Sequence, residues 1–297
     1  MKRSIVLLIT LALIVAISSL LYLELEMVDR SSKEVEQKRN FVQKSLFLQS
    51  VVDILRKKTG DINSSDGLEL LIYLPIDLET EEIEAHISFD SAAKGINPNN
   101  FLKKVQNKEQ IDPEYVLLFD RILQTFNVQN KELFIAMIED TLDKDLDERI
   151  PGSEIALYDK RFAQGSIENE KKFRMLIDAY IRLTEDGNIK KVPWEEIVSF
   201  YNKQIDINYV SPTLLRLMLP YLDAQVIERI TTKRDRLYKD VNDLPLAKED
   251  KEELKKYGFS GFVPVVRGEL VVKQQSEERA RFVYDIKQKK VLDIAIF

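Results

Sequence analysis

The sequence begins with an uncharged apolar stretch that determines where the rest of the chain can fold. Residues 5–23 contain no charged side chain. At about 1.5 Å of rise per residue, a helix of this length spans roughly 28 Å, close to the thickness of the hydrocarbon core of a bilayer. Lys2 and Arg3 precede it, so the positive-inside rule predicts a cytoplasmic N-terminus and a chain that crosses the membrane by Leu23. An ordinary signal anchor or a cleaved signal peptide are the alternatives, but no small-x-small cleavage site follows.

The helical pattern continues beyond the apolar stretch into a charged segment. Apolar residues recur there at helical spacings: Val28, Val35, Val42, Leu46, Val52 and Leu55. Because residues 5–58 contain no Pro or Gly, we expect one helix of about 54 residues, roughly 80 Å long, that ends before Thr59 and Gly60. Its first half is apolar and its second half amphipathic. This plan resembles type IV pilins and pseudopilins, whose helix packs first beside other helices and then against its own sheet.

The first four residues resemble the short basic leader that a prepilin peptidase removes from such subunits on the cytoplasmic side. Cleavage is expected after Ser4, which makes Ile5 the first mature residue. Ser4 stands where Gly is usual. Most such subunits also carry Glu as their fifth mature residue, whereas this chain has Ile9.

Composition excludes several classes of function. A net charge of −6 argues against nucleic-acid binding, which depends on neutralising phosphates. The chain has no Cys, so no disulfide framework stabilises it. Its one His, His86, alternates with apolar neighbours and is predicted to lie on the solvent face of a strand. A serine or histidine hydrolase is disfavoured, and a membrane-anchored hydrolase would depend on carboxylates alone.

The remaining pattern predicts a sheet interrupted by a helical insert. Strands are expected at residues 68–78, 83–89, 263–272, 279–286 and 290–297. Helical periods dominate residues 91–260, with helices expected at residues 98–107, from 113, and at 133–142, 167–183, 194–201, 213–219, 224–237 and 247–256. The fold class is therefore α+β: a pilin-like head, with a long N-terminal helix and an antiparallel sheet, formed by residues 24–90 and 261–297, carries a large inserted all-α domain.

Part of the insert resembles a helix-hairpin-helix or SAM-like unit. Its two helices, residues 213–219 and 224–237, flank a hairpin from Pro220 to Asp223. Versions that bind DNA use a Gly-rich hairpin whose backbone approaches a phosphate closely. This hairpin has no Gly, and Asp223 would repel a phosphate, so the pattern favours a packing unit.

An acidic segment follows the predicted helix at residues 133–142. Its alternating carboxylates are candidate ligands of a hard cation such as Ca²⁺, which takes 6–8 oxygen atoms: Asp143, Asp145, Asp147 and Glu154. The spacing is not that of an EF-hand, since Gly is missing at the sixth loop position and Glu at the twelfth. The alternative is a solvated acidic loop with Asp residues at helix ends.

Several short motifs along the chain resemble protein K of the general secretion pathway, the family of large minor pseudopilins of type II secretion systems. They are Ile96-Asn97-Pro98-Asn99, Ile138-Glu139-Asp140 with Asp143-Lys144-Asp145, Pro151-Gly152-Ser153-Glu154 with Tyr158, Ile207-Asn208 with Ser211-Pro212 and Leu215, and Arg234 with Leu237, Asp240 and Leu244. This family also lacks the fifth-position Glu, which agrees with Ile9.

The resemblance implies a subunit and not an enzyme. The implied protein is anchored in the inner membrane of a Gram-negative bacterium, with its head in the periplasm, and helps to export folded proteins across the outer membrane. Its implied partners are minor pseudopilins I and J at the tip of the pseudopilus, and family members have been seen with calcium in the head. The rival function is a membrane-anchored, pilin-like nucleic-acid receptor for DNA uptake.

Overall fold

The computed structural model describes Gln49 and residues 51–79, 84–105, 108–232, 236–273 and 277–296. The chain forms two compact units, Met1–Lys58 and Thr59–Phe297. In the first unit, residues 51–58 are helical, and this helix ends at Lys58 as expected. The predicted leader and the predicted membrane span at residues 5–23 lie outside the described residues.

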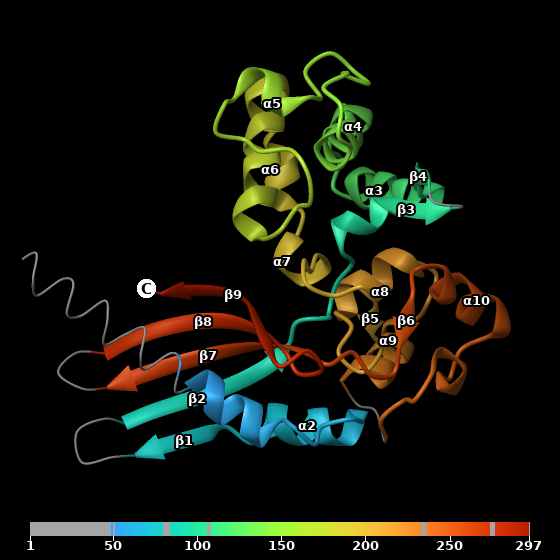
Figure 1. Ribbon diagram of the computed structural model, residues 1–297. Coiled ribbons are helices and arrows are strands. Elements are labelled where there is room, and N and C mark those ends of the chain that lie inside the picture. Colours follow the sequence, from blue (N-terminus) through green and yellow to red (C-terminus); the bar gives the residue numbers. More distant parts are fainter. Residues whose placement is uncertain are drawn as a thin grey trace, which may run out of the picture. The chain divides into compact units, whose positions relative to one another are not determined.

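A five-stranded antiparallel sheet joins the two ends of the second unit, as the sequence predicts (Figure 1). The strand order is β1-β2-β7-β8-β9. The strands are β1 (Ile76–Glu79), β2 (Glu84–Ser91), β7 (Val265–Lys273), β8 (Glu277–Asp285) and β9 (Lys290–Ile296). Because β2 pairs with β7, the sheet closes across the whole inserted segment, and both ends of that segment leave from adjacent strands.

The alternation along β2 confirms the placement of His86. Ala85, Ile87 and Phe89 are buried on one face of this strand, while Glu84 and His86 are exposed on the other. His86 lies opposite Asp77 of β1, and its Nδ1 is 2.6 Å from the Asp77 carboxylate. His86 therefore belongs to an exposed cross-strand pair.

The segment before β1 corrects the sequence prediction. Residues 68–78 were expected to be a strand, but Ser65–Tyr73 form helix α2 and only the part beyond Pro75 is extended. The Ser64 side chain accepts from the Gly67 N–H and caps the helix. Leu68 and Leu71 are buried three residues apart on one helical face, and α2 lies against the sheet at β2 (Figure 1). The cap and this spacing outweigh the apolar run that suggested a strand.

Replacing Gly268 by alanine is expected to destabilise the sheet by about 1–3 kcal/mol. Gly268 of β7 lies opposite Phe282 of β8, and a Cβ on Gly268 would be 2.1 Å from the buried Phe282 ring. Gly187 is the matched control, because its Cβ would meet nothing within 4 Å. Urea unfolding of the full chain in detergent measures both variants, and equal midpoints for them would contradict this packing.

The insert is mainly helical, as expected. Its helices are α3 (Pro113–Thr125), α4 (Lys131–Leu142), α5 (Ile155–Tyr158), α6 (Glu170–Thr184), α7 (Trp194–Ile197), α8 (Pro212–Met218), α9 (Ala224–Thr231) and α10 (Lys248–Lys256). Short 3₁₀ turns are η1 (Pro98–Phe101), η2 (Gly187–Lys191) and η3 (Val241–Asp243). The insert also contains two small strand pairs that the sequence analysis missed: β3 (Leu102–Val105) with β4 (Lys108–Ile111), and β5 (Ile205–Asp206) with β6 (Phe259–Ser260).

The helix expected at residues 98–107 is wrong. Asn97 caps only the 3₁₀ turn η1, after which the chain enters the β3–β4 hairpin. The other helices differ from expectation at their ends. The α6 helix starts at Glu170 because the Asn169 side chain caps it, and α7 ends at Ile197 because Val198 forms a parallel bridge with Ile96. The α9 helix ends at Thr231, well before the predicted end.

An aromatic cluster lies at the centre of the insert. The Phe134 ring of α4 is 6.2 Å from Phe173, 5.6 Å from Tyr180 and 5.7 Å from Trp194, measured between centroids. The Phe119 ring of α3 stacks on Trp194 at 6.2 Å. Since Trp194 is the only tryptophan of the chain, its fluorescence reports on the packing of this insert.

Candidate functional site

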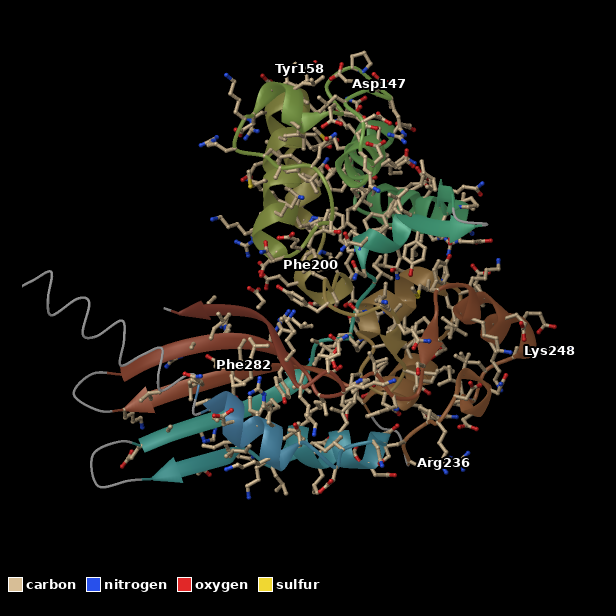
Figure 2. All side chains as sticks on the ribbon, in the orientation of Figure 1. Asp147, Tyr158, Phe200, Arg236, Lys248 and Phe282 are labelled. Atoms are coloured by element: carbon tan, nitrogen blue, oxygen red, sulfur yellow. The ribbon has the colours of Figure 1, made fainter. Side chains whose placement is uncertain are left out.

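The acidic segment predicted from the sequence lies between α4 and α5, at the end of the insert that also carries Asp147 and Tyr158 (Figure 2). Asp143 ends α4 as its C-cap residue. Glu154 begins α5, and its side chain accepts from the Ala156 N–H at 3.3 Å. The turn between them requires Gly152, whose φ of +91° is a left-handed conformation that disfavours side chains.

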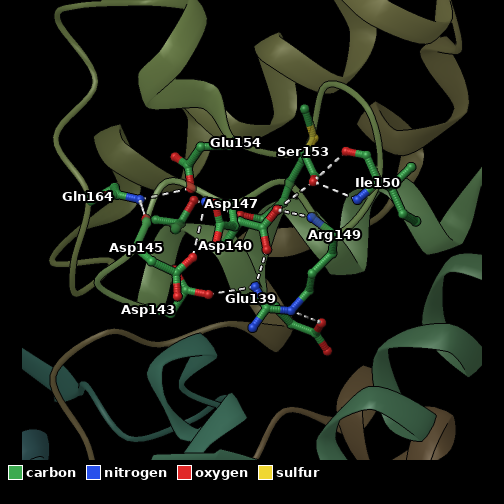
Figure 3. A network of polar contacts seen from close by, with 12 residues as sticks. Glu139, Asp140, Asp143, Asp145, Asp147, Arg149, Ile150, Ser153, Glu154 and Gln164 are labelled. Atoms are coloured by element: carbon green, nitrogen blue, oxygen red, sulfur yellow. Dashed lines mark hydrogen bonds and ion pairs between the residues drawn. The ribbon is translucent and has the colours of Figure 1, made fainter.

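Arg149 is the cation at the centre of this segment (Figure 3). Its Nη1 bonds to Asp140 Oδ1 and lies 2.5 Å from Asp143 Oδ2. Its Nε is 3.3 Å from Glu139 Oε2. Asp140 has 0% of its side chain exposed, so the charge that Arg149 neutralises there is fully buried.

The second oxygen of Asp140 is also satisfied from within the segment. Asp140 Oδ2 accepts from the Ser153 hydroxyl and from the Arg149 N–H, the latter at 3.1 Å. Ser153 Oγ in turn accepts from the Ile150 N–H at 3.1 Å. Asp140 therefore ties the end of α4 to the turn before α5. The sequence analysis included Asp140 in a motif but missed the role of Arg149, because the burial of Asp140 is visible only in the structure.

The four predicted calcium ligands lie in one loop, but protein donors already bind several of their oxygens. Asp145 Oδ1 accepts from the Asp147 N–H at 3.1 Å, and Glu154 Oε2 accepts from Gln164 at 2.8 Å (Figure 3). Asp143 Oδ1 is buried and has no hydrogen-bond partner among the described residues. Within those residues, no group of three or more acidic, His or Cys side chains is placed to hold a metal ion. In this arrangement the four predicted ligands do not surround a common point where calcium could bind. Calcium binding stays a prediction.

Burial dominates the electrostatics of this segment. Desolvation raises the pKa of Glu139 and of Asp143 above their ordinary values, against the opposing effect of Arg149. Desolvation likewise raises the pKa of Glu154. Partial burial acts to lower the pKa of Arg149, but its hydrogen bonds to Asp143 and Asp140 outweigh burial and raise it. Arg149 is therefore charged at neutral pH.

The Asn residues of the first motif bind the insert together. The Asn97 side chain donates to the carbonyls of Phe200 and Asn202, at 3.0 and 2.8 Å. The Asn99 side chain both donates to the Ile167 carbonyl and accepts from its N–H. These asparagines connect segments about 70 to 100 residues apart in the chain, so their role is structural.

The motif that contains Asn208 has the same structural role, at the junction of the insert with the sheet. Asn208 is 1% exposed and bonds to both backbone groups of Tyr238 and to the Gly261 carbonyl. Asp206 is fully buried and accepts from the N–H groups of Asn208 and Val263, at 2.9 and 3.0 Å. The Ser211 side chain caps α8, where Pro212 occupies the first turn.

The hairpin between α8 and α9 offers no phosphate site. The Asp223 side chain accepts from the Gln225 N–H at 2.7 Å and so caps α9. A carboxylate already lies at this helix start, where a DNA phosphate would otherwise bind backbone N–H groups. The Tyr221 hydroxyl, also in the hairpin, donates to Asp250 at 2.6 Å.

Comparison with known proteins identifies a similar fold. No family model and no curated protein matches the chain. Among solved structures, it is similar to a chain of the GspK-GspI-GspJ complex from the enterotoxigenic Escherichia coli type 2 secretion system, with a TM-score of 0.62 and 12% sequence identity. The match covers 88% of this chain and 98% of that chain. This likeness shows the fold.

The structure is an α+β fold, as expected, and the match supports its likeness to the fold of that chain. At 12% identity it does not by itself establish the function. Among the described residues, no helix has the length and apolar composition to cross a membrane.

Proposed function

We propose that this chain is a minor pseudopilin of a type II secretion system. The fold likeness to a chain of the GspK-GspI-GspJ complex, over 88% of this chain, is the observation that supports it. The sequence adds support through the uncharged stretch at residues 5–23 and the motifs around Ser153 and Asn208. The protein is a structural subunit and not an enzyme. A prepilin peptidase removes its leader, residues 5–23 anchor it in the inner membrane of a Gram-negative bacterium, and its head is periplasmic.

The proposed position is the distal tip of the pseudopilus. Packed helices lie 8–10 Å apart, whereas a folded insert of about 170 residues is roughly 40 Å wide. Heads of this width do not fit beside every helix of a tightly packed filament, but they fit where no subunit stacks beyond them. Ile9 is consistent with this position. Most pilin-like subunits have Glu there, which is proposed to pair with the N-terminal amine of a neighbouring subunit. A subunit at the end of the filament does not need that pair.

The proposed partners are the two smaller minor pseudopilins that correspond to I and J. The full chain, co-expressed with both and extracted in detergent, is expected to purify as a complex with one copy of each. On sheared filaments, an antibody to residues 91–260 is expected to label one end. Failure to bind either partner would reject the function, and labelling along the shaft would reject the position alone.

A DNA-uptake receptor has no specific observation in its favour. Asp223 caps α9 at the hairpin where a phosphate would bind, and the net charge of the chain is −6. A salt-dependent DNA-binding assay on the full chain distinguishes the two functions, since the proposed pseudopilin is expected to bind no DNA.

A further inference from the structure

Three acidic side chains cluster at the end of α4. Glu139, Asp140 and Asp143 come within one turn of each other, and all three are largely buried: their side chains are 12%, 0% and 16% exposed. Burying a carboxylate without a counter-charge is strongly unfavourable. This group therefore needs a cation.

Arg149 is that cation by its contacts. Its guanidinium reaches all three carboxylates: Nη1 bonds to Asp140 and Asp143, and Nε forms an ion pair with Glu139 at 3.3 Å. Among the described residues, no other ion pair involves these three acids. The planar guanidinium presents several N–H donors in a fixed geometry, which suits a site with more than one acid.

The backbone around Arg149 holds it in place. The Arg149 N–H donates to Asp140 Oδ2, so main chain and side chain of one residue bind the same carboxylate. Ser153 binds the same oxygen of Asp140, and the Gly152 N–H donates to Glu148 at 2.8 Å. The cation is thus built into the turn that connects α4 to α5.

We infer that Arg149 is the resident cation of the Glu139, Asp140 and Asp143 group, so that the α4–α5 segment folds without bound metal. Calcium at the free Oδ1 of Asp143 would lie beside the Arg149 guanidinium, which binds Oδ2 of the same carboxylate, and the two cations would repel each other. The inference concerns this segment alone and does not depend on the proposed function.

Chelation of the wild-type protein is the first test. Thermal unfolding of the full chain in detergent is followed by Trp194 fluorescence, with excess chelator or with millimolar Ca²⁺. The two midpoints are expected to agree within about 1 °C, whereas calcium at a hundredfold excess over its Kd would raise the midpoint by roughly 5–10 °C. A midpoint that falls by more than about 2 °C on chelation overturns the inference.

Removal of the arginine is the second test. Arg149→Met keeps much of the side-chain volume but leaves buried carboxylates without a counter-charge, and the midpoint is expected to fall by roughly 5–10 °C. Arg161→Met is the matched control, because Arg161 is 85% exposed and pairs with Asp159 at the surface. Its midpoint is expected to change by about 1 °C or less. Equal shifts in the two variants would overturn the inference.

A double variant separates charge from packing. If Arg149 acts by neutralising Asp143, then adding Asp143→Asn to Arg149→Met removes part of the uncompensated charge and recovers part of the lost midpoint. Strictly additive losses would show that Arg149 acts by packing alone. If Arg149→Met does not fold, Arg149→Lys is measured instead. Lysine retains the positive charge but lacks the planar set of N–H donors, so this variant is expected to fold with a midpoint below that of the wild type.

Discussion

The Asn208→Ala variant is expected to lose about 2–6 kcal/mol of unfolding free energy. The Asn208 side chain donates to the carbonyls of Tyr238 and Gly261, at 3.0 and 2.9 Å, and accepts from the Tyr238 N–H at 2.8 Å. Alanine removes the bonds to the Tyr238 N–H and carbonyl, each at a cost of about 1–3 kcal/mol, whereas the Gly261 carbonyl still accepts from the Ser65 hydroxyl at 2.5 Å.

Asn242→Ala is the matched control for this prediction. Asn242 is exposed, and among the described residues its side chain bonds within its own turn alone, to Asp240 at 2.5 Å. Its loss is expected to stay below about 1 kcal/mol. Urea unfolding of the full chain, read from Trp194 fluorescence, compares the two. A difference of less than about 1 kcal/mol between them would show that Asn208 does not hold the junction.

The Asn208 result also bears on what the family motifs mean. Asn97, Asn99 and Asn208 were identified in the sequence as parts of a resemblance, without a role. In the structure each connects backbone segments that are distant in the chain. A motif of this kind indicates a shared architecture and not a binding site, which is consistent with likeness in fold at 12% identity.

The sheet was predictable because its pattern is local and alternating. Buried and exposed residues alternate along β2 as the sequence indicates, and the late strands complete the same sheet. Helices with a clear start were predictable as well, such as α3 after Asp112 and α8 after Ser211. Their ends were less predictable, because tertiary contacts determine them: α7 stops where Val198 pairs with Ile96.

Two errors have a common physical cause. The Ser64 side chain caps a helix in a segment that was predicted to be a strand because of its apolar run. At Asn97 the same kind of cap starts only one 3₁₀ turn, because Asn99 and Asn100 bond to Ile167 and Tyr115 and the chain turns into a hairpin. A cap indicates where a turn begins, and the contacts of the following residues decide how far it continues.

The candidate site was only partly predictable for a related reason. The sequence shows which carboxylates lie in the segment but not which of them are buried. Burial distinguishes Asp140, with 0% exposure, from the exposed Asp145 and Asp147. It also moves the electrostatic centre of the segment from the loop to the end of α4, where Arg149 lies. Carboxylate spacing alone suggests an external cation, whereas the structure supplies an internal one.

The Phe134→Ala variant is expected to lose roughly 3–5 kcal/mol, because a fully buried ring leaves a cavity that the surrounding side chains fill only in part. Phe134 also makes edge contacts with Phe173 and Tyr180, and such pairs add about 0.5–1.5 kcal/mol each to the burial of the ring.

Leu117→Ala is the control for this loss, since Leu117 lies on α3 with 59% of its surface exposed and is expected to cost less than about 0.5 kcal/mol. Because the substitution removes a neighbour of Trp194, the unfolding of both variants is followed by far-ultraviolet circular dichroism and not by fluorescence. A Phe134 variant as stable as the Leu117 variant would place the core of the insert elsewhere. The expected loss instead makes the aromatic cluster the part of the insert that holds α3, α4, α6 and α7 together, and with them the α4 end at which Arg149 meets its carboxylates.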